Sequence, residues 1–489
     1  MKLYQLALIT VISHFGIVSF ANSSCIGDDT GFCELGLSVF QPWCWGYEAN
    51  CSFDEQLFNR PLCEGSPKPW VNTMEEKIEK FWRQADFGYI QDFLSTISDF
   101  CVPRKSHQGH LKCSTNMRYC HSRNLVLDFK EYNFDTRDRF LEDIAERVVI
   151  GGDCIVESDK IDMNGQQGGA LQSWHRELRK FKTMSMGHNC DVTIERPVVF
   201  MKLDAGVNMY HHFCDFVNLY ASQHLNRSFS RDVELIRWDT GTLYYQDLFK
   251  SVWKVFTSHA IRSLSEFSGK IVCFKEAMFS LPPRMYYGLF YNMPLVPQCY
   301  GSGLMKAFSR HTLSRLNIKH RPLDKQVQVT LVPRNTKFRN ILNQEELISA
   351  LNTVGAINLT VIEYNPRHMS FIQQLDQTYN SDVFITMHGA GLTHLLFLPD
   401  WGSVIELYNC DDAACYRDLA AIRGVKYFTW EESEALFPQD EGHHPSLGAH
   451  KKFTNYSFKL EAFLKLVLKA VDYIIQHKPT VSHHIHTEL

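Results

Sequence analysis

The sequence lacks an excess of either charge sign. Its 489 residues include 50 Lys and Arg against 54 Asp and Glu, which gives a formal net charge of -4. Such a balance supplies no broad positive field that would attract nucleic acid, so any phosphate group must be bound at a local site. With 45% hydrophobic residues, the chain is too apolar for a disordered protein and long enough for two or three globular domains.

Long apolar runs are also scarce. Met1 and Lys2 precede one such run over residues 3–20, and Ala21 and the polar Asn22 follow it. This pattern predicts a signal peptide over residues 1–21 that is cleaved on entry into the secretory pathway. A membrane anchor is the alternative, but the run contains polar residues and has only the shortest length that crosses a bilayer. Since no second run of about 20 apolar residues follows, we expect no membrane span in the mature protein.

The last four residues are His486-Thr487-Glu488-Leu489, which differ at one position from the His-Asp-Glu-Leu sequence that retention receptors bind. A retention signal functions only in a protein that has entered the secretory pathway, so the two ends of the sequence support each other. We expect the protein in the lumen of the endoplasmic reticulum, where the retention receptor would bind residues 486–489.

No Cys-x-x-Cys pair occurs, which argues against a thioredoxin-like redox site and against a zinc ribbon. The 15 cysteines instead include eight between Cys25 and Cys120, a density that predicts disulfides formed under oxidising conditions. The odd count leaves at least one thiol unpaired. Five Asn-x-Ser/Thr sequences are candidate glycosylation sites in a secretory protein, at Asn22, Asn50, Asn226, Asn358 and Asn455.

Residue periodicity divides the rest of the chain. We interpret the Cys-rich residues 22–130, with a predicted helix from Met74 to about Trp82, as an amino-terminal extension wrapped onto the body of the protein. A β-α-β-α alternation predicts a first Rossmann-like lobe within residues 131–322. Its predicted strands cover residues 198–201 and 232–238, and its predicted helices cover residues 208–225 and 247–256.

A more regular alternation predicts a second lobe within residues 323–480, joined to the first by a hinge at residues 322–325. The predicted strands are 327–332, 359–363, 383–386, 403–407 and 425–429, and the predicted helices are 345–351, 369–378, 391–397 and 416–423. Asn343 and Glu346 resemble a capping box at the start of the first of these helices. Such alternation is typical of a parallel, doubly wound sheet, in which ligands bind beyond the carboxyl ends of the strands.

Several residues at these predicted strand ends could bind a nucleotide. Arg334 and Arg339 follow the first strand and could neutralise the charge on a departing nucleoside diphosphate. His388-Gly389-Ala390-Gly391 forms a strand-to-helix turn in which the glycines would let the backbone approach a diphosphate. Glu406 ends the next strand and could accept hydrogen bonds from ribose hydroxyls. A tight turn, solvated arginines and a structural carboxylate are the respective alternatives.

The first lobe contains a second candidate cluster, between residues 202 and 215. Asp204, His211 or His212 could act as a general base that deprotonates an acceptor hydroxyl. His211 and Asp215 lie four residues apart on one predicted helix face, so a metal site is a competing interpretation. A hydrogen-bonded core histidine is the simplest alternative for each histidine alone.

The segments Met201–Phe216, Met387–Trp401, Glu406–Cys410 and Lys452–Ser457 resemble glycosyltransferase family 61. The resemblance covers most of the chain from about Phe81 onward. It implies a GT-B-like α/β fold, with the acceptor on the first lobe and a nucleotide-sugar donor on the second. It further implies inverting transfer of N-acetylglucosamine from UDP-GlcNAc to Ser or Thr hydroxyls of EGF-like domains. UDP-xylose as donor, an O-mannose acceptor, and a non-catalytic glycan-binding protein are the alternatives.

The sequence departs from the family pattern at Ser258-His259-Ala260, where relatives carry an acidic Asp-Tyr-Asp triplet. Without these carboxylates, a manganese ion that bridges protein and diphosphate is less well supported. Cationic side chains could neutralise the diphosphate instead, and the sequence leaves both options open.

Deletion of His486–Leu489 is expected to move the protein from the endoplasmic reticulum into the culture medium without changing its fold, because terminal segments rarely contribute to a core. Immunoblots of cells and medium, together with the processing of the N-linked glycans, measure this change. Replacement of Thr487 by Asp is the control, and we expect it to tighten retention. Equal secretion of the intact and truncated chains would show that the tail is not recognised.

Overall fold

The computed structural model describes residues 61–479 except for the short stretches 106–107, 135–136, 166–168, 186–189, 242–244 and 286–294. The predicted signal peptide, the cysteines from Cys25 to Cys51 and the predicted retention tail lie outside the described residues. All described residues belong to one compact unit, residues 40–489. Within the described ranges, none of the helices combines the length and apolar character that crossing a membrane requires.

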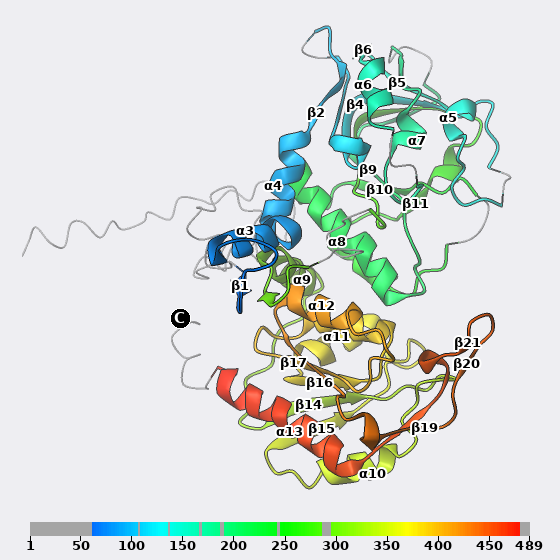
Figure 1. Cartoon of the computed structure of the whole chain (residues 1–489). Helices are drawn as coiled ribbons and strands as arrows, with labels where there is room; N and C mark the ends of the chain where they lie inside the picture. Colours follow the sequence, from blue (N-terminus) through cyan, green and yellow to red (C-terminus); the bar gives the residue numbers. More distant parts are fainter. Residues whose placement is uncertain are drawn as a thin grey trace, which may run out of the picture. The chain divides into compact units, whose positions relative to one another are not determined.

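Five parallel strands form the sheet of the second lobe (Figure 1). Their order across the sheet is β15, β14, β16, β17, β18, and their bounds are Val327–Val332 (β14), Ile357–Val361 (β15), Val383–Thr386 (β16), Ser403–Glu406 (β17) and Lys426–Thr429 (β18). The chain therefore goes from β14 outward to β15 and then crosses back to β16. The predicted parallel, doubly wound sheet is confirmed for this lobe. A topological switch point lies between the carboxyl ends of β14 and β16.

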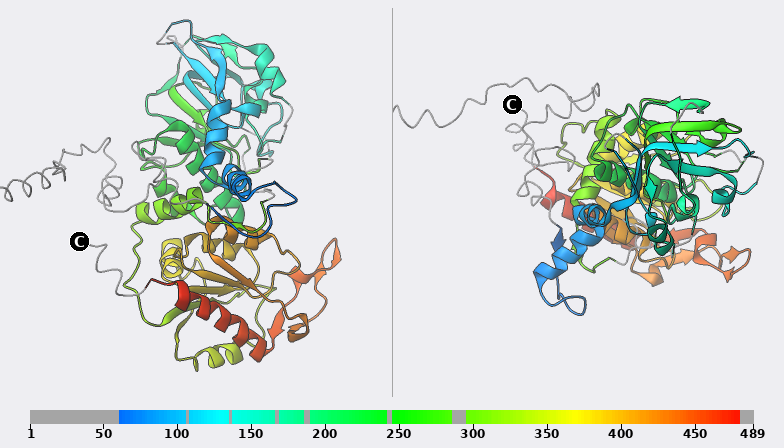
Figure 2. Two further views of the ribbon diagram at one scale, coloured as in Figure 1. Left: turned by 60° about the vertical axis from the view of Figure 1, so that its left-hand side comes forward. Right: turned by 90° about the horizontal axis from the view of Figure 1, so that it is seen from above.

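Helices cover both faces of this sheet (Figures 1 and 2). α13 (Leu460–His477) and α10 (Gln344–Leu351) lie on one face, whereas α11 (Phe371–Tyr379), α12 (Cys415–Arg423) and the 3-10 helix η4 (Ala390–Phe397) lie on the other. Alternation along the strands explains the arrangement. In β16, Ile385 packs in the cluster that contains Phe463 of α13, while its neighbour Phe384 packs with Leu392 of η4.

Some predicted elements differ in detail. The helix expected over residues 391–397 is the 3-10 helix η4, and the one expected over residues 247–256 is a shorter 3-10 helix, η2 (Lys250–Val255). The capping box predicted at Asn343 is wrong, because its Nδ2 donates to Glu346 at 2.8 Å and its Oδ1 accepts the Phe458 N–H at 3.1 Å. Asn343 thus links the start of α10 to the segment before α13.

The first lobe contains an 11-stranded mixed sheet within the described residues. β9, β10, β11 and β12 run parallel, but β12 pairs antiparallel with β4, and β3 and β2 continue the sheet antiparallel. The prediction of a second doubly wound parallel sheet is therefore wrong for this lobe. The bounds are Ser98–Val102 (β2), His110–Cys113 (β3), Cys120–Asp128 (β4), Val149–Gly152 (β5), Ile155–Val156 (β6), Lys182–Thr183 (β7), Val192–Ile194 (β8), Val198–Met201 (β9), Glu234–Arg237 (β10), Arg262–Ser263 (β11) and Ile271–Phe279 (β12).

Short connections explain the antiparallel part of this sheet. The turns between β2, β3 and β4 are too short for the crossover that parallel pairing requires. The predicted extension through residue 130 therefore includes three strands that pair directly within the lobe. The helices around them are Met74–Ala85 (α3), Phe87–Thr96 (α4), Ile144–Arg147 (α5), Ser158–Met163 (α6), His175–Leu178 (α7), Met209–Asn226 (α8), Gly303–Arg315 (α9), and the 3-10 helices Thr115–Met117 (η1) and Leu264–Phe267 (η3).

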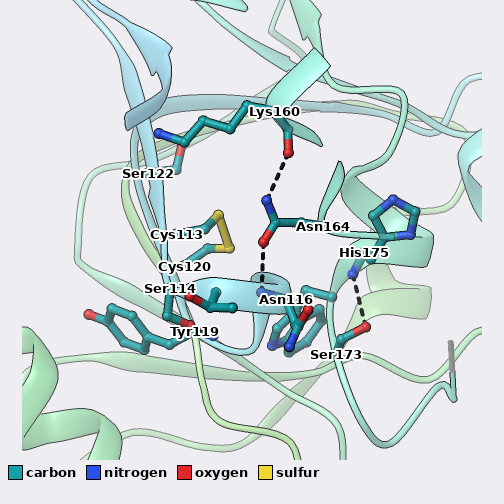
Figure 3. Close-up of a disulfide and its surroundings, with 12 residues drawn as sticks. Cys113, Ser114, Asn116, Tyr119, Cys120, Ser122, Lys160, Asn164, Ser173 and His175 are labelled. Atoms are coloured by element: carbon teal, nitrogen blue, oxygen red, sulfur yellow. Dashed lines mark hydrogen bonds between the residues drawn. A yellow bond between two sulfur atoms is a disulfide. The ribbon is translucent and has the colours of Figure 1, made fainter. Parts of the chain in front are cut away.

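Four disulfides connect described residues, in agreement with the prediction of an oxidised protein: Cys63–Cys299, Cys101–Cys154, Cys113–Cys120 and Cys190–Cys273. Cys113–Cys120 closes the β3–β4 hairpin (Figure 3). Next to it, Asn164 accepts the Asn116 N–H at 2.8 Å and donates to the Lys160 carbonyl at 2.8 Å. The hairpin turn is thereby tied to α6. Free thiols among the described residues belong to Cys214, Cys410 and Cys415.

Small two-stranded sheets complete the fold. β1 (Leu62–Cys63) pairs with β13 (Cys299–Tyr300) beside the Cys63–Cys299 disulfide. The segment between β18 and α13 contains β19 (Leu436–Pro438), β20 (His443–His444), β21 (Gly448–Ala449) and β22 (Tyr456–Phe458), with the 3-10 helices Ser433–Ala435 (η5) and Lys451–Phe453 (η6). In that segment the candidate glycosylation site Asn455 hydrogen-bonds to Asn340 and Gln439, whereas Asn358 on the edge strand β15 is exposed.

α8 packs against η4, and both helices contribute to one hydrophobic cluster. The Phe213 ring of α8 lies 5.6 Å from the Phe397 ring of η4 and 5.9 Å from the Phe371 ring of α11. All three side chains are buried. The helix that follows β9 is therefore held against the helix that follows β16, which fixes the strand ends of the two lobes relative to each other.

Asp86 connects two helix starts that are far apart in sequence. Its Oδ1 accepts the backbone N–H groups of Phe87 (2.8 Å) and Leu304 (2.9 Å), and its Oδ2 accepts that of Gly303 (2.9 Å). The carboxyl group thus satisfies amides at the first turns of both α4 and α9. Burial raises the pKa of Asp86 to about 7, against the opposing effect of these three hydrogen bonds.

An Asp86→Ala substitution should lower the free energy of unfolding by about 3 kcal/mol, because three buried N–H groups lose their acceptor at roughly 1 kcal/mol each. Urea unfolding followed by tryptophan fluorescence measures the change. Neutral surface substitutions change the free energy of unfolding by up to about 0.5 kcal/mol. A change no larger than this in Asp86→Ala would contradict the assigned role.

The matched control is Asp86→Asn, which keeps an acceptor oxygen but cannot ionise. Because the pKa of Asp86 is higher in the folded than in the unfolded protein, the folded state binds more protons between about pH 4 and pH 7. The contribution of Asp86 to stability therefore falls as the pH rises through this range. Relative to wild type, the Asn variant should gain stability toward pH 7.

Candidate active site

A cavity of about 610 Å³ lies where the carboxyl ends of β14 and β16 approach the start of α8. Both lobes line it. Its polar and aromatic lining includes Asn208, Tyr210 and His211 from the first lobe, and Arg334, Arg339, His388, Asp412, Tyr416, Asp418 and Lys452 from the second. The position matches the switch point of the parallel sheet, and the volume is typical of small-molecule sites.

Arg334 and Arg339 bring two positive charges to one point. The Nη1 atoms of both residues donate to the carbonyl oxygen of His388, at 3.3 Å from Arg334 and 3.0 Å from Arg339. The Nε atoms of both are buried without a hydrogen-bond partner, and neither guanidinium pairs with a carboxylate among the described residues. Burial and the charge of Arg339 lower the pKa of Arg334 to about 10. Two adjacent cations without a counter-charge form a site for an anion.

Gly389 allows this approach of the arginines to the turn. Its φ of 145° is a backbone conformation that residues with a side chain rarely adopt. A Cβ atom here would lie 2.4 Å from Nη1 of Arg334 and 3.2 Å from Nη1 of Arg339. Ala390 also lines the cavity, whereas Gly391 does not, and a Cβ atom at Gly391 would meet nothing within 4 Å. The predicted need for glycine thus has a structural basis at Gly389 alone.

Glu406 holds His388 and does not reach the cavity. Its Oε1 accepts a hydrogen bond from Nδ1 of His388 at 2.6 Å, and its Oε2 accepts one from the Tyr427 hydroxyl. The Glu406 side chain is fully buried. A carboxylate without exposed oxygen cannot bind ribose hydroxyls, so the geometry does not support that predicted role. Glu406 instead fixes the histidine whose carbonyl oxygen binds both arginines.

Lys452 and Asp412 contribute charges that the sequence analysis did not identify. Nζ of Lys452 lies 2.8 Å from Oδ2 of Asp412, which is also 3.8 Å from Nε2 of His388. Tyr210 and Tyr416 add aromatic wall, with their rings 5.9 Å apart. Lys452 begins one of the segments that resemble the family, Lys452–Ser457, so the sequence did contain a signal for this residue. Tyr210 lies in another of these segments, Met201–Phe216, whereas Asp412 and Tyr416 lie outside all of them.

His211 lines the cavity, and its imidazole is hydrogen-bonded to Asp204. Oδ2 of Asp204 accepts a hydrogen bond from Nδ1 of His211 at 2.8 Å, which leaves the lone pair of the neutral imidazole on Nε2. Arg284 donates to both oxygens of Asp204, at 2.7 and 2.8 Å. Burial would raise the pKa of Asp204, but the hydrogen bonds from His211 and Arg284 outweigh it and lower the pKa. Of the predicted bases, His211 therefore has the geometry of a proton acceptor, and Asp204 orients it.

His212 is a structural residue in this arrangement. Its side chain is fully buried, with Nδ1 at 2.7 Å from Asp215 and Nε2 at 3.3 Å from Asp247. Burial alone would lower its pKa, but the two carboxylates raise it to about 8. Asp215 also accepts the backbone N–H of Asp204 at 3.0 Å. His212 and Asp215 thus fix the loop that carries Asp204, and the geometry does not support His212 as a catalytic base.

The competing metal interpretation requires His211 and Asp215 to coordinate the same ion. Each side chain is instead hydrogen-bonded to a different residue, His211 to Asp204 and Asp215 to His212. Within the described residues, no cluster of three or more His, Cys, Asp or Glu side chains has the geometry of a metal site. The divergent Ser258-His259-Ala260 lies away from the cavity lining, with Nε2 of His259 at 2.7 Å from Asp232.

A parallel sheet with a pair of arginines at its switch point, next to a histidine oriented by an aspartate, suits a transferase that uses a nucleotide-activated donor. The glycosyltransferase 61 family matches residues 87–405, and the chain belongs to this family.

Among its relatives are proteins named EGF domain-specific O-linked N-acetylglucosamine transferase. The Canis lupus familiaris and Mus musculus proteins are each 49% identical over 440 residues, which cover 89% of this chain and 83% of the relative. The Drosophila melanogaster protein is 42% identical over 453 residues, 91% of this chain and 86% of the relative.

A Gly389→Ala substitution should weaken binding of a nucleoside diphosphate about tenfold or more, because the new Cβ displaces the Arg334 guanidinium. Calorimetric titration with UDP measures the affinity, and the unfolding temperature reports whether the fold survives. Gly391→Ala is the matched control, since its Cβ enters open space. Equal losses in both variants, or none in either, would contradict this account.

Proposed function

We propose that this protein is an inverting transferase that moves N-acetylglucosamine from UDP-GlcNAc to Ser or Thr hydroxyls of extracellular EGF-like domains. The names of its relatives, at 49% identity over 89% of the chain, support the sugar and the acceptor. The structural observation that carries the proposal is the part-buried pair of Arg334 and Arg339, which has no carboxylate partner among the described residues, in a cavity that His211 also lines.

The reaction follows from these positions. The acceptor hydroxyl loses its proton to Nε2 of His211 while its oxygen forms a bond to the anomeric carbon. The bond between that carbon and the β-phosphate oxygen breaks on the opposite side, and UDP leaves with the electron pair. Arg334 and Arg339 neutralise the charge that develops on the diphosphate, and Asp204 stabilises the imidazolium that forms.

This proposal assigns a GT-B-like arrangement, with the donor on the second lobe and the acceptor on the first. The five-stranded sheet with arginines at its switch point supports the donor assignment. The first lobe departs from a doubly wound sheet, but the start of α8, the helix that follows β9, still lies at the cavity. In the first lobe, the order of a strand followed by a helix is thus retained for β9 and α8, the elements next to the site.

The residues present do not fit a resident manganese ion. Such an ion prefers several unpaired oxygen ligands. Two acidic residues line the cavity, but Asp412 is paired with Lys452 at 2.8 Å and Asp418 with Arg417 at 3.2 Å. The proposed mechanism therefore contains no step through a metal ion, and Arg334 and Arg339 supply the positive charge.

The lumen of the endoplasmic reticulum is the proposed location, with the retention receptor and EGF-like domains of secreted and cell-surface proteins as partners. The four disulfides support an oxidising compartment. EGF-like domains are themselves folded under such conditions, so the enzyme would meet its acceptors there.

Arg334→Ala and Arg339→Ala should each lower transfer about 100-fold, which corresponds to about 2.7 kcal/mol of lost charge stabilisation. The assay incubates the purified protein with UDP-GlcNAc and a folded EGF repeat and detects the added sugar by mass spectrometry.

Arg367→Ala is the control, because Arg367 is exposed and lies outside the cavity lining. UDP-xylose in a parallel reaction tests the other donor. Transfer from UDP-xylose alone would replace the proposed sugar, and absence of transfer from any donor by wild type would refute the proposed function.

A further inference from the structure

The first lobe contains a second cavity of about 640 Å³ that the proposed reaction does not use. Its lining comes from the loop before α5, from the loop before α7 together with Arg176 of α7, and from Arg284 after β12. The side chains that matter here are Arg139, Phe140, Leu171, Arg176 and Arg284. Both apolar and charged side chains therefore line this cavity.

The second cavity is linked to the active site by hydrogen bonds through one carboxylate, that of Asp204. Arg284, which lines the second cavity, donates to both oxygens of Asp204, and Asp204 accepts the hydrogen bond of His211, which lines the first cavity. Arg139, another lining residue, donates to the backbone oxygen of Asp204 and through Nε to Asp239 at 2.9 Å. A transferase must bring its acceptor to the base, and residues of both cavities are hydrogen-bonded to the aspartate that orients this base.

The lining of the second cavity suits a polypeptide. Phe140 and Leu171 offer apolar surface, and the Arg139 guanidinium lies 4.9 Å from the Phe140 ring. Arg176 pairs with Glu142 at 2.9 Å, where the Glu142 side chain is 80% exposed and free to exchange this partner for a ligand group. A nucleotide would need several positive charges without carboxylate partners. Each arginine of this cavity already has such a partner: Arg139 pairs with Asp239, Arg176 with Glu142 and Arg284 with Asp204.

Arg284 is also tied to the loop that borders the second cavity. Its backbone N–H donates to the carbonyl oxygen of Leu171 at 2.9 Å. A ligand that contacts Leu171 therefore acts on the backbone of Arg284, whose side chain holds Asp204. Three consecutive hydrogen-bonded contacts therefore connect Leu171 to His211: Leu171 with Arg284, Arg284 with Asp204, and Asp204 with His211.

From these contacts we infer that the second cavity binds the polypeptide that carries the acceptor hydroxyl, and that Arg284 is a positioning residue that aligns Asp204 and His211 with it. The inference rests on the proposed function for the identity of the base. It adds the location of the acceptor and a residue that couples acceptor binding to proton transfer.

Arg176→Ala tests the acceptor site. We expect the KM for a folded EGF repeat to rise about tenfold, with an unchanged Kd for UDP and an unchanged rate of UDP-GlcNAc hydrolysis by water. Arg179→Ala is the matched control, because Arg179 follows the same short helix and pairs with Glu146 in the same way but lies outside the cavity lining. Phe140→Ala is a second test that leaves the ion pairs intact.

Arg284→Gln tests the positioning role. Without the guanidinium, the charge of Asp204 is less compensated and stabilises protonated His211 more strongly. The limb of the kcat profile in which the rate rises with pH should therefore move to higher pH, and Arg284→Lys should partly restore it. A loss of rate without a shift of this limb would show that Arg284 has only a structural role.

The outcomes separate the two proposals. An unchanged acceptor KM in both Arg176→Ala and Phe140→Ala, or an equal effect in Arg179→Ala, would overturn the acceptor site even if wild type is fully active. If wild type transfers no sugar, the proposed function fails, and calorimetric binding of the folded EGF repeat still tests the cavity. Weaker binding in Arg176→Ala than in Arg179→Ala would then support the site, and equal binding would overturn it.

Discussion

Two part-buried guanidinium groups that donate to one carbonyl oxygen are the constraint on which the rest of the active site depends. Arg334 and Arg339 repel each other, and the His388 carbonyl oxygen alone cannot neutralise them. The protein therefore keeps this oxygen in place through the buried His388–Glu406 hydrogen bond and leaves the next residue, Gly389, without a side chain. Two like charges held side by side are unfavourable, and the proposed diphosphate would offset this repulsion.

In the first lobe, one carboxylate, that of Asp204, determines the orientation of His211. Asp204 binds His211 and Arg284 through its side chain, while Asp215 holds its backbone N–H. Each contact removes a degree of freedom from the imidazole, so its orientation is determined before a substrate arrives. The packing of Phe213 on Phe397 holds this half of the site against the half that contains the arginines.

The sequence predicted the second lobe well because its strands pair with near neighbours and its helices lie between them. It failed for the sheet of the first lobe because β4 pairs with β12, about 150 residues later, and local periodicity does not reveal such a partner. Arg334, Arg339 and Gly389 were identifiable from their place at strand ends. The separate roles of Asp204 and His211 were not, since burial and hydrogen-bond direction decide them, and Asp412 lies in an irregular segment without a recognisable pattern.

The Cys63–Cys299 disulfide has a consequence for biosynthesis. Its partners are 236 residues apart, and β1 pairs with β13 at the same place. At typical translation rates, Cys63 must wait on the order of ten seconds or more for its partner to be made. Cys113 and Cys120, only seven residues apart, can pair almost at once. During synthesis Cys63 is thus exposed to pairing with the wrong cysteine, which makes the nascent chain a natural client for thiol–disulfide exchange catalysts.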